Sequence, residues 1–206
     1  MKLTVLLPAL LLSFVGFSKE TNNTLIPLEG DGTIYHVPTQ EEVMYVYPLE
    51  VFSPYTGMTY LGFKEAVAMS ESSGNYFAVN RLGYRGRYQF GTSTLRWVGI
   101  RNSNRFLKSP RLQERAFEAL VAKNKFLLRN HLEKFEGKIV GGIKITESGL
   151  IAAAHLGGAG NVKKFLDSNG KNVFSDGNGM PVTAYMKKFS DYDISMIKPN
   201  SLAKAI

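Results

Sequence analysis

Residues 109–135 read SPRLQERAFEALVAKNKFLLRNHLEKF and form the longest helical pattern in the chain. Ser109 is a preferred N-cap residue, and Pro110 suits the first helical position, where its missing N–H group would have no partner. Side chains then recur at helical spacing along one stripe, which consists of Phe117, Leu120, Val121, Lys125, Leu128 and Leu132. The pattern predicts a helix over 110–135 that ends before Gly137.

Shorter helical patterns flank this stretch on both sides. Before it, the sequence predicts helices over 61–70 and from Thr92 through Val98. After it, Thr146 suits the N-cap of a helix through Leu156, and two further helices are predicted over 161–166 and 182–189. Residues 80–90 are rich in Gly, Arg and Tyr and suit a loop or a small hairpin. We therefore expect a mainly α (α+β) fold with a small β-hairpin or loop region.

The N-terminal quarter of the chain shows no helical pattern of this kind. Residues 3–18 form an uncharged run of sixteen residues that stops at Lys19, which is shorter than the ~20 apolar residues of a spanning helix. A basic Lys2, an apolar core and small residues near its end are typical of a signal peptide. Residues 19–56 carry four prolines and no sustained period, as expected of an extended arm or linker. We expect three parts: a signal peptide (1–18), an arm (19–56) and a helical domain (57–206).

The composition limits the partners that this chain could have. The formal net charge is +8 and the chain has no cysteine, so neither a disulfide nor a cysteine-linked lipid can form. A basic chain suits nucleic acid, anionic lipid or an anionic cell-wall polymer. Export through the signal peptide disfavours nucleic acid and places the protein in the periplasm or outside the cell. We expect a monomer without a stable membrane span after cleavage of the signal peptide.

Three short blocks carry residues that simple helix packing does not need. The first, 71–76, reads ESSGNY and places a carboxylate at the end of an apolar helix. The second, 83–90, reads GYRGRYQF, and its paired glycines would let the backbone approach a ligand. The third, 152–162, reads AAAHLGGAGNV, with small residues that allow close approach. Together they predict a binding groove with one acid.

In this order and spacing, the blocks resemble the soluble lytic transglycosylase domain of the lysozyme-like superfamily, which is related to goose-type lysozymes. Glu71-Ser72 matches the family's catalytic Glu-Ser pair, and Gly83, Gly86 and Gln89 fall on its Gly-x-x-Gly-x-x-Gln block. Residues 154–158 lie over a later Ala-Tyr-Asn-Ala-Gly block, with His155 in place of Tyr and Leu156 in place of Asn. The resemblance covers residues 61–189.

The resemblance implies that the chain cleaves the glycosidic bond between N-acetylmuramic acid and N-acetylglucosamine in peptidoglycan. Glu71 would protonate the leaving oxygen and then take a proton from the muramic C6 hydroxyl, which closes a 1,6-anhydro ring. Tyr185, near the C-terminus, is the residue expected to reach Glu71. The residues expected to contact the glycan strand are Ser72, Gly86, Tyr88, Gln89, His155, Gly157, Gly158 and Tyr185.

Other readings of the same residues stay open. A hydrolytic lysozyme would need a positioned water and usually a second acid. A non-catalytic peptidoglycan-binding or envelope-assembly module would keep the groove and lose the chemistry. Glu147 is the rival acid near a block, but at the start of a helix a carboxylate favours the helix dipole. We expect no cofactor and no metal, because His36, His131 and His155 show no metal-ligand spacing.

Overall fold

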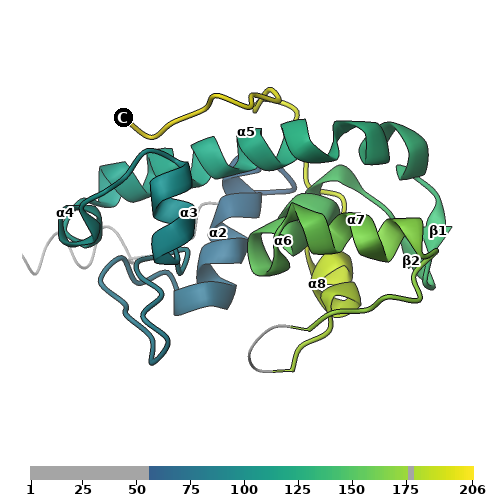
Figure 1. Ribbon diagram of the computed structural model, residues 1–206, viewed down its shortest axis with the longest axis horizontal. Coiled ribbons are helices and arrows are strands. Elements are labelled where there is room, and N and C mark those ends of the chain that lie inside the picture. The colour runs from purple at the N-terminus through teal and green to yellow at the C-terminus, as the bar shows by residue number, and fades with distance from the viewer. Residues whose placement is uncertain (1–55, 176–178) are drawn as a thin grey trace, which may run out of the picture. The chain divides into compact units, whose positions relative to one another are not determined.

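The longest predicted helix is the backbone of the domain. This computed structural model describes residues 56–175 and 179–206, so the signal peptide and most of the predicted arm lie outside the described residues. Helix α5 (Pro110–Phe135) begins where the sequence predicts, with the Ser109 hydroxyl accepting a hydrogen bond from the Leu112 N–H at 3.3 Å. Figure 1 shows α5 running along the domain with the other helices on one side of it.

The remaining helices confirm the predicted mainly helical fold. They are α2 (Tyr60–Ser72), α3 (Thr92–Trp97), α4 (Ser103–Leu107), α6 (Glu147–Gly157), α7 (Ala159–Asp167) and α8 (Val182–Lys188). Thr146 caps α6 as predicted, because its hydroxyl accepts from the Gly149 N–H at 3.2 Å. Helix α2 ends at Ser73, which has a left-handed φ of 54°. None of the described helices has the length and apolar composition needed to cross a membrane.

The small sheet lies elsewhere than the sequence suggested. Strands β1 (Ile139–Val140) and β2 (Ile143–Lys144) pair antiparallel across a Gly141-Gly142 turn. Residues 80–90 instead form a loop with single antiparallel bridges, from Arg85 to Val79 and to Phe90. Helix α4, which the sequence did not predict, is capped by Asn102, whose side chain accepts from the Arg105 N–H at 2.9 Å. Thus the loop reading of 80–90 fits the structure, and the hairpin is a separate element.

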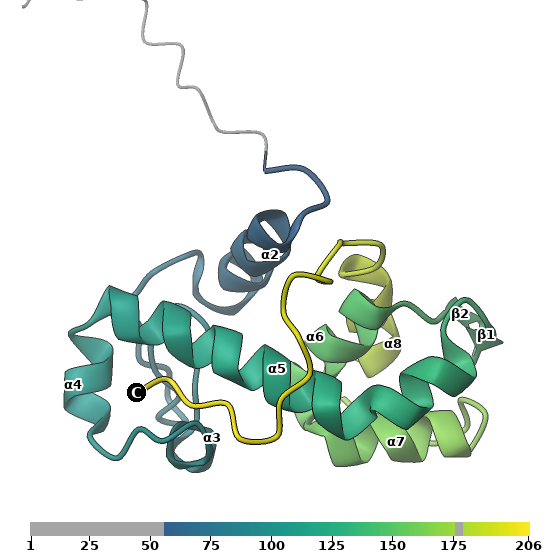
Figure 2. The ribbon, with the colours of Figure 1, turned by 90° about the horizontal axis from the view of Figure 1, so that it is seen from above.

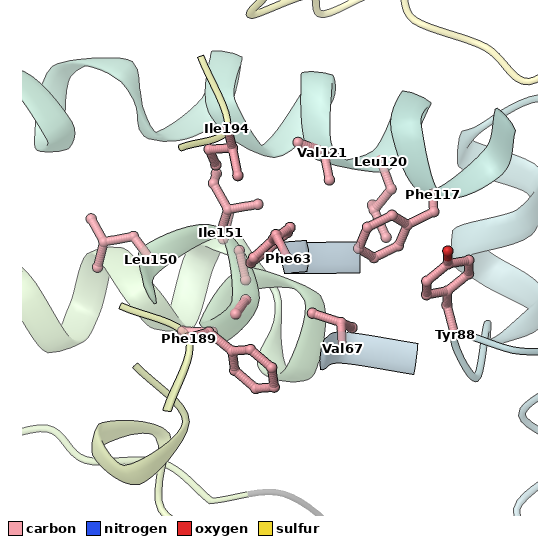
Figure 3. Packing of buried hydrophobic residues seen from close by; sticks show 14 of the residues in the cluster. Phe63, Val67, Tyr88, Phe117, Leu120, Val121, Leu150, Ile151, Phe189 and Ile194 are labelled. Atoms are coloured by element: carbon pink, nitrogen blue, oxygen red, sulfur yellow. The ribbon is translucent and has the colours of Figure 1, made fainter. Parts of the chain in front are cut away.

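The core fixes the position of α2 between α5 and the C-terminal helices. The ring of Phe63 on α2 lies 6.1 Å from the ring of Phe117 on α5 and 6.3 Å from that of Phe189 after α8. Figure 3 shows these rings together with Val67 and Ile151, all without measurable exposure or nearly so. Burial of such side chains stabilises by roughly 2 kcal/mol each. Helix α2, which carries Glu71 in its last turn, is therefore held by packing on two sides.

A C-terminal segment, residues 191–206, starts beside α2, where the Tyr192 ring lies 5.8 Å from that of Phe63, and then passes along α5 (Figure 2). Its backbone is tied to the domain by hydrogen bonds from Asn200 N to Ala122 O and from Ala205 N to Val98 O, both 3.0 Å. The Lys125 ammonium, which falls on the predicted apolar stripe, donates to Ile194 O at 3.0 Å. Figure 2 shows the segment passing over α5 toward α3 and α4. This cover explains why Lys125 can be buried.

Candidate functional site

Glu71, in the last turn of α2, meets side chains from two other helices. The hydroxyl of Tyr185, from α8, donates a hydrogen bond to Glu71 Oε1. The Nε2 atom of His155, from α6, lies 3.9 Å from the same oxygen. The side chain of Glu71 is 17% exposed, so it is partly shielded but open to a ligand. Residues far apart in sequence thus converge on one carboxylate.

Glu71 lies in a cleft of about 620 Å³. The cleft is lined by Ser70, Glu71, Asn80, Gln89, Leu156, Gly179, Met180, Pro181, Ala184 and Tyr185. Among these described lining residues Glu71 is the one carboxylate. A volume in this range suits a small-molecule-sized segment of substrate. Glu71, Gln89 and Tyr185 are the predicted site residues that line it, whereas Asn80, Ser70 and the 179–181 segment were not predicted.

The loop that carries Gln89 is fastened directly to the end of α2. The Ser72 hydroxyl donates to the backbone oxygen of Arg87 at 2.8 Å. Gln89 has a positive φ of 48°, and its side-chain amide donates to Gly86 O at 2.9 Å. A positive φ is uncommon for a residue other than glycine, so the surrounding contacts must hold Gln89 in this conformation. Ser72 therefore acts as a link between Glu71 and the loop.

Three residues predicted to contact a ligand pack closely against other parts of the protein. Tyr88 has no exposed surface, and its ring stacks on Phe117 with centroids 4.1 Å apart. Gly86 is buried, and a Cβ there would lie 2.7 Å from Gln113 Cδ. A Cβ on Gly157 would lie 2.7 Å from Phe174 Cδ2. All three pack against the protein's own side chains, and none is among the described residues that line the Glu71 cleft.

Gly158 lies on the surface where α6 ends and α7 begins. It combines a φ of 83° with a ψ of 149°, and no atom lies within 4 Å of the position that a Cβ would occupy. This backbone conformation is essentially restricted to glycine. Gly158 is absent from the residues that line the Glu71 cleft, so the structure explains it as a helix junction.

A charged network that was not predicted from sequence joins the 86–89 segment to α5. The Arg87 guanidinium donates to Glu65, to the Tyr76 hydroxyl at 2.7 Å and to Glu114 at 3.2 Å. Glu114 also accepts from Lys64 at 2.6 Å. Burial opposes ionisation of Glu114, but the hydrogen bonds from Lys64, Tyr76 and Tyr88 outweigh it and hold the pKa of Glu114 below its ordinary value. Hydrogen bonds to an ionised carboxylate are the stronger ones, so the network holds the loop best while Glu114 is ionised.

The His155 side chain lies beside Glu71 and is almost fully buried. Its side chain is 8% exposed, and its ring lies edge-on to Phe90 and Phe117, with centroids 6.0 Å and 5.7 Å away. Its Nδ1 atom is buried and has no hydrogen-bond partner among the described residues. The polar contact available to this ring is therefore the one through Nε2, toward the carboxylate.

Glu147, the rival acid, lies outside the cleft. Its carboxylate forms an ion pair with the Lys125 ammonium at 3.0 Å, and the Lys125 side chain is 4% exposed. Removing one partner of a buried pair leaves an uncompensated charge, which is strongly destabilising. The position of Glu147 in the first turn of α6 also favours the helix dipole. Both contacts give Glu147 a structural role.

The described residues contain no group of three or more His, Asp or Glu side chains that could hold a metal ion. What the site offers is a shielded carboxylate with a phenolic hydroxyl and an imidazole beside it, which suits proton transfer to and from a bound ligand. Comparison of the chain with protein-family models, with curated proteins and with solved structures found no match.

Proposed function

We propose that the chain is a peptidoglycan lytic transglycosylase in which Glu71 is the general acid and base. One observation carries the proposal. The resemblance implies that Tyr185 reaches the catalytic glutamate, and the Tyr185 hydroxyl donates to Glu71 Oε1 across 114 residues of sequence. This contact depends on the packing of α2 against α8, so it is independent of the local motif that singled out Glu71.

In the proposed reaction, Glu71 starts protonated and the glycosidic C1–O bond breaks as its proton moves to the leaving oxygen. The N-acetyl group of the substrate stabilises the positive charge that develops at C1, as in substrate-assisted glycosidases. The C6 oxygen then bonds to C1 and gives its proton back to Glu71. Water takes no part, and the product carries a 1,6-anhydromuramic end.

Several residues around Glu71 have separate tasks in this reaction. The Tyr185 hydroxyl donates to one carboxylate oxygen, which leaves the other oxygen for the substrate and stabilises the ionised form after proton transfer. Gln89 and Asn80 line the same cleft and offer amide groups to sugar hydroxyls and N-acetyl groups. Tyr88, Gly86 and Gly157 serve the site indirectly, through packing.

A hydrolytic lysozyme is the nearest alternative. An inverting hydrolase needs a second carboxylate ~6.5–9.5 Å from the first, and a retaining one ~5–5.5 Å from it. Among the described residues that line the cleft there is no second Asp or Glu, which supports the water-free route. The hydrogen bond from the Tyr185 hydroxyl to the shielded Glu71 carboxylate favours a catalytic site over a non-catalytic glycan-binding module.

Digestion of purified peptidoglycan followed by mass spectrometry of the released fragments separates these functions. The proposal predicts fragments with anhydro ends, and no incorporation of ¹⁸O when the digestion is run in heavy-oxygen water. Fragments about 18 Da heavier in ordinary water, and about 20 Da heavier in heavy-oxygen water with ¹⁸O at their reducing ends, would indicate a hydrolase, because hydrolysis adds one water to each cut. Binding to insoluble peptidoglycan with no released fragment would indicate a non-catalytic module.

A further inference from the structure

A second pocket, which the proposed reaction does not use, lies beside α3 and α4. It has a volume of about 1060 Å³ and lies between the α3–α4 region, the start of α5 and the C-terminal segment. Figure 2 shows the chain end lying near α3 and α4. The pocket is lined by Arg96, Gly99, Ile100, Arg101, Asn102, Arg105, Leu112, Lys204 and Ile206. It shares no lining residue with the Glu71 cleft.

The pocket gathers four positive charges without a compensating carboxylate side chain. Arg96, Arg101, Arg105 and Lys204 all line it, and no Asp or Glu does. None of the four forms an ion pair with a described carboxylate, in contrast to Arg87, Lys64 and Lys125. Like charges that share a concave surface repel one another and raise the local concentration of anions. This pocket is therefore electrostatically prepared for a negatively charged ligand.

The positive potential also acts on a neighbouring group inside the protein. The Lys123 ammonium is buried beneath the C-terminal segment and donates to Ser201 O at 2.6 Å. Burial, and then repulsion from Lys204, hold the pKa of Lys123 below its ordinary value.

The cations lie on backbone that is held in place. Asn102 caps α4 through the Arg105 N–H, and Ile100 N donates to Leu95 O at 2.8 Å. Ala205, next to Lys204, is 2% exposed and donates to Val98 O at 3.0 Å. Because this backbone is already ordered, ligand binding costs conformational entropy mainly in the side chains. The pocket thus combines a preformed backbone with four cationic side chains that lie exposed on the surface.

We propose that this pocket binds the phosphate groups of a linear polyanion. The guanidinium groups come from three places, α3, the α3–α4 loop and α4, and this spread suits the tetrahedral oxygens of phosphate. A planar carboxylate would need only one guanidinium group, which binds it through two parallel N–H groups. The volume is large enough for several phosphates in series. No aromatic ring is among the lining residues, so the pocket lacks the stacking platform that single-stranded nucleic acid uses.

The chain contains its own reporter for this test. Trp97 is the one tryptophan of the sequence, follows Arg96, and is 41% exposed. Its ring lies 4.9 Å from the Lys123 ammonium. Binding of linear inorganic polyphosphate is measured by isothermal titration calorimetry and, in parallel, by tryptophan fluorescence. Inorganic phosphate, poly-glutamate and single-stranded oligonucleotides of matched charge are titrated in the same buffer.

A pair of double variants locates the binding. Arg101→Gln/Arg105→Gln removes two charges from the pocket, and Lys138→Gln/Lys171→Gln removes two exposed charges elsewhere. The first should weaken polyphosphate binding at least about tenfold and make its salt dependence shallower, and the second should leave affinity within about twofold of the unmodified chain. Thermal unfolding of both variants checks that the fold is retained.

Three outcomes would overturn the proposal: no polyphosphate binding by the unmodified chain, equal losses in the two double variants, or binding of poly-glutamate or oligonucleotide as tight as that of polyphosphate. The inference does not depend on glycan cleavage. Glu71→Gln should therefore bind polyphosphate as the unmodified chain does.

Discussion

Replacing Gly86 with alanine should destabilise the domain by about 3 kcal/mol. Two terms contribute. Gly86 has a φ of 77°, and a residue with a Cβ in this region costs about 1–2 kcal/mol. The added Cβ would also overlap the side-chain amide of Gln113, which is fully buried. That amide accepts from Arg87 N and donates to the carbonyl oxygens of Tyr76, Phe106 and Leu107. Displacing it leaves buried polar groups unsatisfied, at about 1–3 kcal/mol.

The assay is urea and thermal unfolding of matched glycine variants. Gly83→Ala is the control, because Gly83 has a φ of 81° but no atom within 4 Å of the added Cβ. It should show the backbone term alone, about 1–2 kcal/mol. For a unit of this size, Gly86→Ala should lower Tm by roughly 10 °C. In a Gln113→Ala background, Gly86→Ala should cost no more than the backbone term. Equal losses for Gly86→Ala and Gly83→Ala in the unmodified chain would refute the packing argument.

Further expectations concern Tyr185, Glu114 and Glu147. Tyr185→Phe should lower the initial rate of peptidoglycan clearing roughly 10–100-fold, since one charge-assisted hydrogen bond is lost, while far-ultraviolet circular dichroism stays unchanged. Because the pKa of Glu114 is lower in the folded chain, its contribution to stability is full above its unfolded value of 4.5 and is lost as pH falls through the folded value. Urea midpoints should therefore fall with acidification, and less steeply in Glu114→Gln. Glu147→Gln should lower Tm, while the clearing rate at temperatures below unfolding stays within about twofold of that of the unmodified chain. A large loss of rate in this variant would indicate that Glu147, and not Glu71, is the catalytic acid.

The sequence predicted the elements that carry strong local signals. Ser109 and Thr146 cap α5 and α6 as predicted, because an N-cap hydroxyl acts on N–H groups only a few residues away. Helix α4 has five residues and cannot show a helical period. The β1–β2 hairpin did leave a signal, the Gly141-Gly142 pair between Ile139-Val140 and Ile143, since glycines with φ of 59° and 77° allow its two-residue turn.

The candidate site was predictable only in part. Glu71 and Tyr185 followed from the resemblance, and their contact depends on packing that no local pattern records. The burial of Tyr88 could have been found from the alternation over 86–90, because Gly86, Tyr88 and Phe90 are buried and the residues between them are not. The Arg87–Glu114 network joins the loop to α5, and such long-range pairing has no signature in one sequence.

The most direct test of the central claim is the rate of peptidoglycan clearing by Glu71→Gln, beside Glu133→Gln as a matched control on the exposed face of α5. Glutamine keeps the shape of Glu71 and can still accept the Tyr185 hydrogen bond, but it cannot donate an acidic proton. General acid–base catalysis contributes about 10²–10⁴-fold, so Glu71→Gln should lose that factor while it keeps its Tm and its binding to insoluble peptidoglycan. Glu133→Gln should clear peptidoglycan at the rate of the unmodified chain. Retention of more than about a tenth of the rate in Glu71→Gln would contradict the assignment of Glu71 as the acid.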